Sequence, residues 1–450
     1  MRHIKYIGLD MDHTLIRYYT EAFESLVYRL SQEILVEELG YPKRCLELKF
    51  DFNLAIRGLV MDKPNGNILK LSRHGGIRQS YHGTTPMSFE EQRNFYRSTY
   101  VDLSDSAFSP IDTAFSMATC VLYAQLVDLN DQQYGKAFAS YDRLAKDVIM
   151  AVDQVHSRGK LKKFVRAHLE QFVIKDPDIV KGIKRYINHG KKIFIITNSD
   201  YEYTKSLLEF ALTPFLNEGE HWSDLFEYVI TLADKPRFFV DQLRFFKIDP
   251  QSGLMSNLEG PLLPGIYQGG CAKKFTDDLK LQGDEILYLG DHIYGDVLRL
   301  KKDCNWRTAL VVEELGDEIK GQIKAQPYEQ EINLLLKQKV PIERDYVELS
   351  SKKVEEDTTE YDQRIEAFLA ELGELDEKLS DALMKQRLCF NSQWDRVFRA
   401  GAEESYFAHQ VNRFACIYME KLADLFNCSP RSYFRTIRRP LAHEMNSDRV

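Results

Sequence analysis

The sequence predicts an α/β protein in which a doubly wound parallel sheet carries a large, mainly helical insertion and a helical C-terminal extension. Two patterns lead to this fold class: short apolar runs alternate with helix-like segments, and one interval between runs is far longer than a crossover needs. Right-handed crossovers build a sheet whose active site lies beyond the carboxyl ends of the strands. The runs expected as strands are residues 4–9, 193–196, 228–231, 286–289 and 308–312.

The long interval separates the first run from the second and predicts an inserted domain at residues 18–160. It is roughly 180 residues long, whereas the connections in α/β units commonly take 2–6 residues. The core is then expected to comprise residues 1–17 and 161–345. Within the insertion, the sequence predicts helices at 21–39 and 114–129, and hairpins or loops at 58–71 and near Gly75 and Gly83.

Residues 346–450 are charged and helix-like, and are expected to pack on the core or on a partner subunit. One apolar face favours ordinary helix packing, because its spacing does not hold a strict heptad; a coiled-coil dimer seam is the alternative. Another helix, buried or partner-facing, is expected at 406–426. The apolar face comprises Ile365, Phe368, Leu369, Leu372, Leu375, Leu379 and Leu383.

The composition excludes several classes of protein. A net charge of −8 and a pI near 5.9 provide no general attraction to nucleic acid polymers or to an anionic membrane surface. The N-terminal residues lack the apolar stretch of a signal peptide or membrane span. Seven cysteines without a CxxC pair indicate a reducing, cytoplasmic setting. Because the net charge is negative, an anionic substrate must be bound by local donors and a metal ion.

The strongest chemical signal is the DxDxT pattern Asp10-Met11-Asp12-His13-Thr14, which directly follows the first expected strand. A carboxylate can attack phosphorus, and a second carboxylate two residues later can protonate the leaving alkoxide and then deprotonate water. We therefore predict that Asp10 is the nucleophile and Asp12 the general acid/base. The alternative is a strand-to-helix turn in which Asp and Thr act only as helix caps.

Three further segments follow later strands in an order that supports the same chemistry. Thr197-Asn198-Ser199 can bind phosphoryl oxygens at a helix start, although it also fits a plain N-cap. Asp291 and Asp296, in GDHIYGD, provide the oxygen ligands that Mg²⁺ prefers, although a glycine turn with two polar caps is the alternative. Lys235 follows the third strand and is predicted to compensate the clustered carboxylates; taken alone it would be a surface charge.

Taken together, these segments resemble the haloacid-dehalogenase superfamily with its Rossmann-like core. More narrowly, the chain is similar to the cytosolic purine 5′-nucleotidases that prefer IMP and GMP, and the similarity runs through nearly its whole length. The segments that carry it are DMDHTL, GYPKRCLELKFDFNLAIRGLVMDKPNGNILKL, IFIITNSDYEYTKSLL, DKPRFF, YQGG, ILYLGDHIYGDVLRLKKDCNWRTALV and AHQVNRFACIYMEKL.

The resemblance implies specific roles at the reacting centre. Asp10 would be phosphorylated, Asp12 would be the acid/base, and Lys235 would hold the phosphate together with Thr197, Asn198 and Ser199. Mg²⁺ would be ligated by the Asp10 side chain, the Asp12 backbone carbonyl and Asp291, with Asp296 close behind.

The resemblance also implies that the insertion is a cap that recognises the nucleoside. Asp153 would hydrogen-bond the base or ribose, His156 would stack on the purine, and Lys162 would assist the phosphate. The alternative is a solvated helix face. The chain departs from the family pattern at Ile149, where the family carries an arginine, so a base contact is lost or replaced.

The expected function is hydrolysis of purine nucleoside 5′-monophosphates through an aspartyl-phosphate, with a nucleoside phosphotransferase side activity. The resemblance implies a cytoplasmic homo-oligomer, a dimer or tetramer. One alternative keeps the chemistry with another small phosphomonoester as substrate. Another, from a different class, is a non-catalytic nucleotide-binding or scaffold protein.

Overall fold

The computed structural model describes residues 1–97, 99–132, 138–435 and 444. Its internal contacts divide the chain into two compact units. The core unit comprises residues 1–23, 159–312 and 410–450, and the insert unit comprises 24–158 and 313–409. This division differs from the predicted one, which kept 346–450 together. Across the described residues, every helix is too short or too polar to cross a membrane.

The core unit is built on a nine-stranded sheet of order β12-β11-β13-β10-β9-β1-β14-β15-β18. Its central strands are parallel, and each predicted strand is present, which confirms the α/β fold class. Two edge strands, β11 and β12, run antiparallel to their neighbours. The strands are β1 (Tyr6–Leu9), β9 (Lys192–Ile196), β10 (Tyr228–Thr231), β11 (Phe245–Ile248), β12 (Met255–Asn257), β13 (Gly265–Gly269), β14 (Ile286–Gly290), β15 (Arg307–Val311) and β18 (Ile417–Met419).

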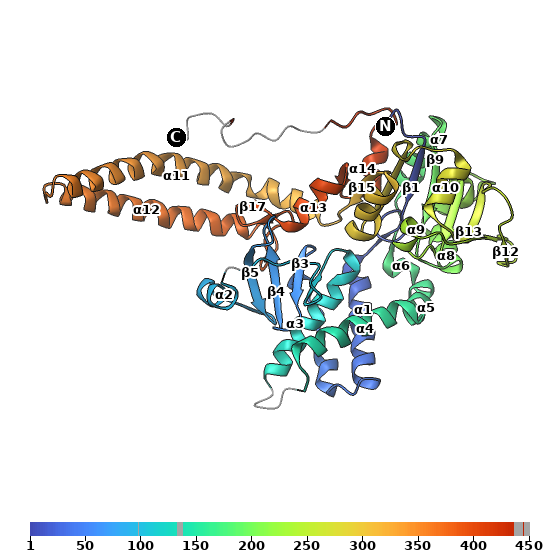
Figure 1. Ribbon diagram of the computed structural model, residues 1–450, viewed down its shortest axis with the longest axis horizontal. Helices are drawn as coiled ribbons and strands as arrows, with labels where there is room; N and C mark the ends of the chain where they lie inside the picture. Colours follow the sequence, from blue (N-terminus) through green and yellow to red (C-terminus); the bar gives the residue numbers. More distant parts are fainter. Residues whose placement is uncertain (98, 133–137, 436–443, 445–450) are drawn as a thin grey trace. The chain divides into compact units, whose positions relative to one another are not determined.

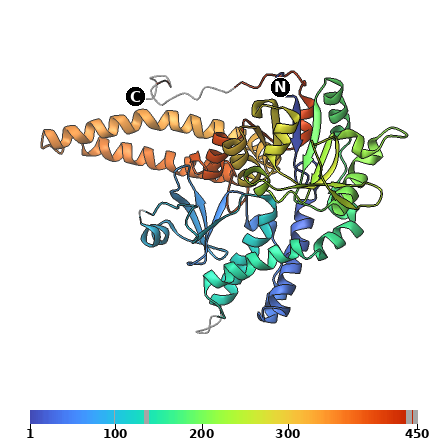
Figure 2. The same cartoon turned by 45° about the vertical axis from the view of Figure 1, so that its right-hand side comes forward.

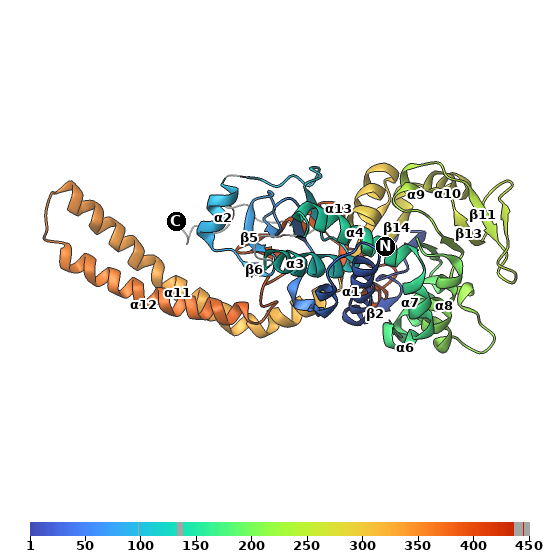
Figure 3. The same ribbon diagram turned by 90° about the horizontal axis from the view of Figure 1, so that it is seen from below.

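Helices cover both faces of this sheet, as a doubly wound fold requires. Figure 3 shows α7 (Pro177–Asn188) and α8 (Tyr201–Leu212) on one side, and α9 (Arg237–Val240) and α10 (Ala272–Leu279) on the other. The central strands β1, β10 and β14 are buried along their whole length, as helices on both faces of a sheet require. Fully buried aromatic side chains fill one of these layers, and each removes a large apolar area from water. They include Phe194, Phe238, Tyr267, Phe275, Tyr288 and Trp306.

The prediction of one helix at 406–426 is wrong. That stretch forms α13 (Tyr406–Phe414), β18 and α14 (Leu422–Asn427) in succession. β18 pairs in parallel with β15, and the Thr308 hydroxyl donates to the Phe414 carbonyl where the helix ends. The unpaired edge of β15 therefore recruits a strand from a segment whose apolar pattern also fits a helix.

The insert unit combines helices with a five-stranded antiparallel sheet of order β6-β5-β4-β3-β7. The hairpin predicted at 58–71 is confirmed as β3 and β4, and the helices predicted at 21–39 and 114–129 are confirmed as α1 and α3. Figure 1 shows α2 at one edge of the sheet. The elements are α1 (Thr20–Glu37), β3 (Leu59–Asp62), β4 (Asn67–Leu71), β5 (Ile77–His82), β6 (Thr85–Pro86), α2 (Phe89–Tyr96), β7 (Phe108–Pro110), α3 (Met117–Asp131) and α4 (Tyr141–Ser157).

A long antiparallel hairpin of α11 (Leu315–Glu355) and α12 (Asp362–Arg387) completes the insert unit (Figures 1 and 2). The predicted apolar face of α12 packs on α11 within the chain, so ordinary helix packing holds. Two members of that face are exceptions, because Leu369 and Leu383 are 49% and 46% exposed. Ala382 is buried in place of Leu383. The ion pair between Lys339 and Asp376, at 2.5 Å, joins the two helices.

Candidate active site

The motif-bearing segments meet because four neighbouring parallel strands end at the same edge of the sheet. β1 pairs with β14 and with β9 in registers that bring Leu9 level with Leu289 and Ile195. The amide of Asp10 donates to the Leu289 carbonyl at 2.8 Å, and the amide of Thr197 donates to the Ile230 carbonyl at 2.9 Å. The chain therefore leaves each strand at the same level.

Asp10 is buried, and the protein fixes one of its two carboxylate oxygens. Oδ1 accepts from the Met11 amide at 2.7 Å and lies 2.8 Å from the Lys235 ammonium. Among the described residues, no donor is found for Oδ2. The loop then turns back sharply, with His13 at a φ of 54° and with a backbone bridge between Asp12 and Ile16. One carboxylate oxygen is thus oriented while the other stays available for chemistry.

Three carboxylates form a cluster that fits a divalent cation. Oxygen atoms of Asp10, Asp291 and Asp296 all lie within 4.8 Å of one another, and all three residues are buried. At the usual metal–oxygen distance of about 2.1 Å, neighbouring ligands in a Mg²⁺ octahedron lie about 3.0 Å apart and opposite ligands about 4.2 Å apart. The three carboxylates therefore have to draw closer together to bind one ion. Gly290 permits this packing, because a Cβ there would lie 2.4 Å from the Asp296 side chain.

Lys235 compensates part of this negative charge. Its ammonium lies 2.8 Å from both Asp10 and Asp296, and it donates to the Tyr288 hydroxyl at 3.2 Å. Burial works against the ammonium, yet Asp10 and Asp296 raise the pKa of Lys235 well above its ordinary value. Burial, reinforced by Asp296 and Asp291, also raises the pKa of Asp10 despite Lys235. A single lysine thus leaves the site short of positive charge, which favours binding of a dication.

The Thr197-Asn198-Ser199 turn lies beside this cluster, and its side chains already have partners. Thr197 is buried and its hydroxyl accepts from the Ser199 amide at 3.0 Å. The Asn198 side chain accepts from the Lys235 amide at 2.6 Å and donates to the Lys235 carbonyl at 3.1 Å. Asn198, predicted only as a phosphate ligand, therefore also fixes the backbone that carries Lys235.

The sequence did not identify the groups that hold Asp12. Its Oδ1 accepts from the Tyr18 hydroxyl at 2.5 Å, and its Oδ2 accepts from the Ser199 hydroxyl at 2.9 Å. Burial, together with the charge of Asp12, raises the pKa of Tyr18 well above its ordinary value, so the hydroxyl stays protonated. No motif in the sequence marks Tyr18, because only the folded chain brings it against Asp12.

The residues predicted to recognise the nucleoside belong to two units. Asp153 and His156 lie on α4 of the insert unit, where Asp153 is exposed and the His156 ring lies 5.4 Å from the Phe115 ring. Lys162 lies on α5 (Lys160–Ala167) of the core unit and pairs with Asp200 at 2.9 Å. This pair and the Tyr203 amide lower the pKa of Asp200 although burial opposes them. The three predicted roles remain predictions.

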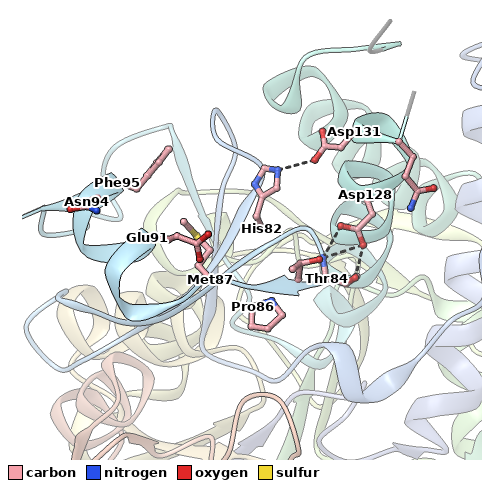
Figure 4. Close-up of a pocket in the computed structure, with 11 residues that line it drawn as sticks. His82, Thr84, Pro86, Met87, Glu91, Asn94, Phe95, Asp128 and Asp131 are labelled. Atoms are coloured by element: carbon pink, nitrogen blue, oxygen red, sulfur yellow. Dashed lines mark hydrogen bonds and ion pairs between the residues drawn. The ribbon is translucent and has the colours of Figure 1, made fainter. Parts of the chain in front are cut away.

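The insert unit also contains an open pocket of about 940 Å³ between α2, β6 and the end of α3 (Figure 4). Its carboxylates are already engaged by the protein. Asp128 accepts from the Thr84 amide and hydroxyl, and Asp131 accepts from the Tyr141 hydroxyl and pairs with His82 at 2.9 Å. These contacts account for the acidic lining, and we assign the pocket no ligand.

Two solved structures align with the chain at low sequence identity. A haloacid dehalogenase-like family hydrolase from Xanthomonas campestris is 10% identical, with 68% of this chain and 82% of that chain covered and a TM-score of 0.24. A predicted phosphoglycolate phosphatase from Haemophilus somnus is 11% identical, with 69% of this chain and 87% of that chain covered and a TM-score of 0.29. At these values neither similarity bears on the activity.

Sequence comparison extends over nearly the whole chain. A 5′-nucleotidase domain-containing protein from Dictyostelium discoideum is 29% identical over 457 aligned positions, covering 99% of this chain and 73% of the relative. The model of the 5′ nucleotidase family matches residues 1–446. That match covers nearly the whole chain and includes the four strand ends at which the aspartates and Lys235 meet. The chain therefore belongs to the 5′ nucleotidase family.

Proposed function

We propose that the protein hydrolyses nucleoside 5′-monophosphates, with a preference for the purine nucleotides IMP and GMP, through a phosphorylated Asp10. The observation that carries the proposal is the buried cluster of Asp10, Asp291 and Asp296 joined by Lys235 at adjacent strand ends. Membership of the 5′ nucleotidase family supports the nucleotide as substrate. The preference for IMP and GMP and a phosphotransferase side activity rest on the narrower resemblance described above.

In the proposed reaction, Asp10 attacks phosphorus in line with the ester oxygen, and Asp12 gives that oxygen a proton as it leaves. Asp12 then removes a proton from the water that hydrolyses the acyl phosphate. Lys235 stabilises the negative charge on the phosphoryl oxygens. Mg²⁺ would be held by Asp10, Asp291 and the Asp12 carbonyl beside Asp296, and would supply charge neutralisation there.

Two further properties belong to this proposal. All seven cysteines are free thiols, which supports a reducing, cytoplasmic setting. A homo-oligomer, a dimer or tetramer, is proposed from the resemblance alone. On α12, Leu369 and Leu383 are exposed among charged surface residues of the same helix. Sedimentation at several protein concentrations measures that state directly.

The central experiment is a phosphate-release assay over purine and pyrimidine monophosphates and several sugar phosphates. We expect IMP and GMP to give the highest kcat/KM, and we expect release to fall at least about 100-fold when EDTA removes divalent cations, because the carboxylates would then repel the substrate. Adding inosine should divert part of the phosphate to the nucleoside.

Other outcomes of this assay select the alternatives. A sugar phosphate as the best substrate would keep the chemistry and replace the nucleotide. If no phosphomonoester is cleaved at any metal concentration while nucleotides still bind, the chain is a non-catalytic binding protein. Calorimetric titration with IMP measures that binding independently of turnover.

The substitution Ile149→Arg tests the base preference. Ile149 is partly buried on α4, the helix that carries Asp153 and His156, and an arginine adds donors suited to a purine carbonyl. We expect kcat/KM for GMP relative to AMP to rise about 10-fold, since one good hydrogen bond to a charged group is worth about 1.5–3 kcal/mol.

Met150→Arg is the matched control, because it places the same charge one residue further along the same helix, where the side chain is 36% exposed. An identical change in both variants would assign the effect to general electrostatics. An unchanged profile in Ile149→Arg would remove position 149 from base recognition.

A further inference from the structure

Both oxygens of the Asp12 carboxylate are held by hydroxyl groups from separate elements. Tyr18 on β2 (Arg17–Tyr18) donates to Oδ1 at 2.5 Å, and Ser199 in the turn before α8 donates to Oδ2 at 2.9 Å. A carboxylate held at one oxygen can still rotate about its χ2 angle, whereas two donors on opposite oxygens fix its plane. The orientation of Asp12 is therefore determined by these two contacts.

Tyr18 is itself firmly placed. It is 1% exposed, and its ring packs on the rings of His13 and Phe23 with centroids 5.0 and 4.8 Å away. Its backbone pairs with β8 (Val173–Ile174), where Tyr18 lies opposite Val173. Because ring and backbone are both fixed, the hydroxyl position is set before a substrate arrives.

We infer that Tyr18 is a positioning residue, which holds the Asp12 carboxyl group where it can pass its proton to the leaving oxygen. This inference rests on the proposed function. As the bond from Asp10 to phosphorus forms and the ester bond breaks, the electron pair of that bond passes to the leaving oxygen, which takes the Asp12 proton. When water attacks the acyl phosphate, its proton returns to Asp12 and Asp10 is released as a carboxylate.

A misplaced acid should matter most for substrates that need the proton. A shift of about 1 Å in a reacting group can lower a rate about 100-fold. Phenolate is a strongly basic leaving group that benefits from protonation, whereas p-nitrophenolate is stable as an anion. The ratio of rates for the two aryl phosphates therefore reports on proton transfer and not on stability or phosphate binding.

The test is Tyr18→Phe, which keeps the ring packing and removes only the hydroxyl. We expect kcat/KM for phenyl phosphate to fall about 30-fold and that for p-nitrophenyl phosphate to fall less than about 3-fold, because general acid catalysis contributes about 10²–10⁴ when fully in place. The KM for both esters should change little. The inhibition constant of inorganic phosphate should stay near that of the wild type.

Tyr186→Phe is the matched control. Tyr186 is also fully buried in the core unit, and its hydroxyl donates to the Leu425 carbonyl at 2.8 Å. This variant should retain the wild-type ratio between the two esters. Equal falls for both esters in Tyr18→Phe, or no fall in either, would overturn the inference, because a purely structural hydroxyl gives one of those results.

The aryl esters need no nucleoside recognition, so this test and that of the proposed function can fail separately. A wild-type protein that cleaves aryl phosphates but no nucleotide contradicts the proposed substrate and leaves the role of Tyr18 to be decided by the ratio. A wild-type protein that cleaves neither contradicts both.

Discussion

Replacing Asp10 with asparagine is expected to abolish phosphate release, lowering kcat by a factor of roughly 10⁴ or more, as removal of a covalent nucleophile does in other enzymes. An amide is a poor nucleophile toward phosphorus and cannot form the acyl phosphate. The substitution keeps the size of the side chain, and its amide oxygen can still accept from the Met11 amide. The loss should therefore arise from chemistry and not from misfolding.

The measurement is steady-state phosphate release, together with acid quenching after incubation with a ³²P-labelled nucleotide. Label should remain on the wild-type chain and be absent from Asp10→Asn. Asp241→Asn is a suitable control, because Asp241 is a partly exposed partner of Arg237 in the same unit and should behave as the wild type. Turnover by Asp10→Asn near the wild-type rate would remove Asp10 from the nucleophile role.

The sequence was sufficient to predict the clustering of the site because the relevant information is local. Each motif directly follows an apolar run, and parallel strands that pair in register end at the same edge of the sheet. Asp10, Thr197, Lys235 and Asp291 follow four such strands in turn. Their proximity therefore follows from the strand assignments, without knowledge of the distances.

The features that the sequence did not reveal depend on contacts between distant segments. Tyr18 and Ser199 are 181 positions apart yet hold one carboxylate, and a lone tyrosine in the sequence carries no signal of that role. The strand β18 forms because β15 offers it an unpaired edge. Local periodicity does not include that edge, and on its own it assigns the segment to a helix. In each case the tertiary partner decides the outcome, and single-sequence patterns do not name the partner.

Lys235→Met should reduce both activity and the stability of the metal-free protein. The methionine keeps most of the volume but leaves Asp10 and Asp296 without their shared cation. Breaking one side of a buried ion pair typically costs about 3–5 kcal/mol. We expect kcat/KM to fall about 10³-fold, because the variant also loses the charge that stabilises the phosphoryl oxygens, as removal of one such donor commonly costs about 10²–10³.

The pH dependence of that loss distinguishes a charge effect from a packing defect. Burial, followed by Asp296 and Asp291, raises the pKa of Asp10, whereas Lys235 opposes the shift. A carboxyl group whose pKa is raised on folding contributes stability that is fully present below its unfolded pKa, about 4, and is lost as the pH rises through its folded pKa. Removing Lys235 raises that folded pKa further and leaves the remaining carboxylates uncompensated.

The free-energy difference between wild type and Lys235→Met should therefore be small near pH 4 and should grow toward pH 8. Urea unfolding in EDTA across that range measures it. Lys192→Met is the matched control, because Lys192 pairs with Glu227 at a half-exposed position, where such pairs contribute only about 0–1 kcal/mol after solvent screening. A difference that stays constant with pH would show that Lys235 stabilises the site through packing, and would contradict its role as the counter-charge to the aspartate cluster.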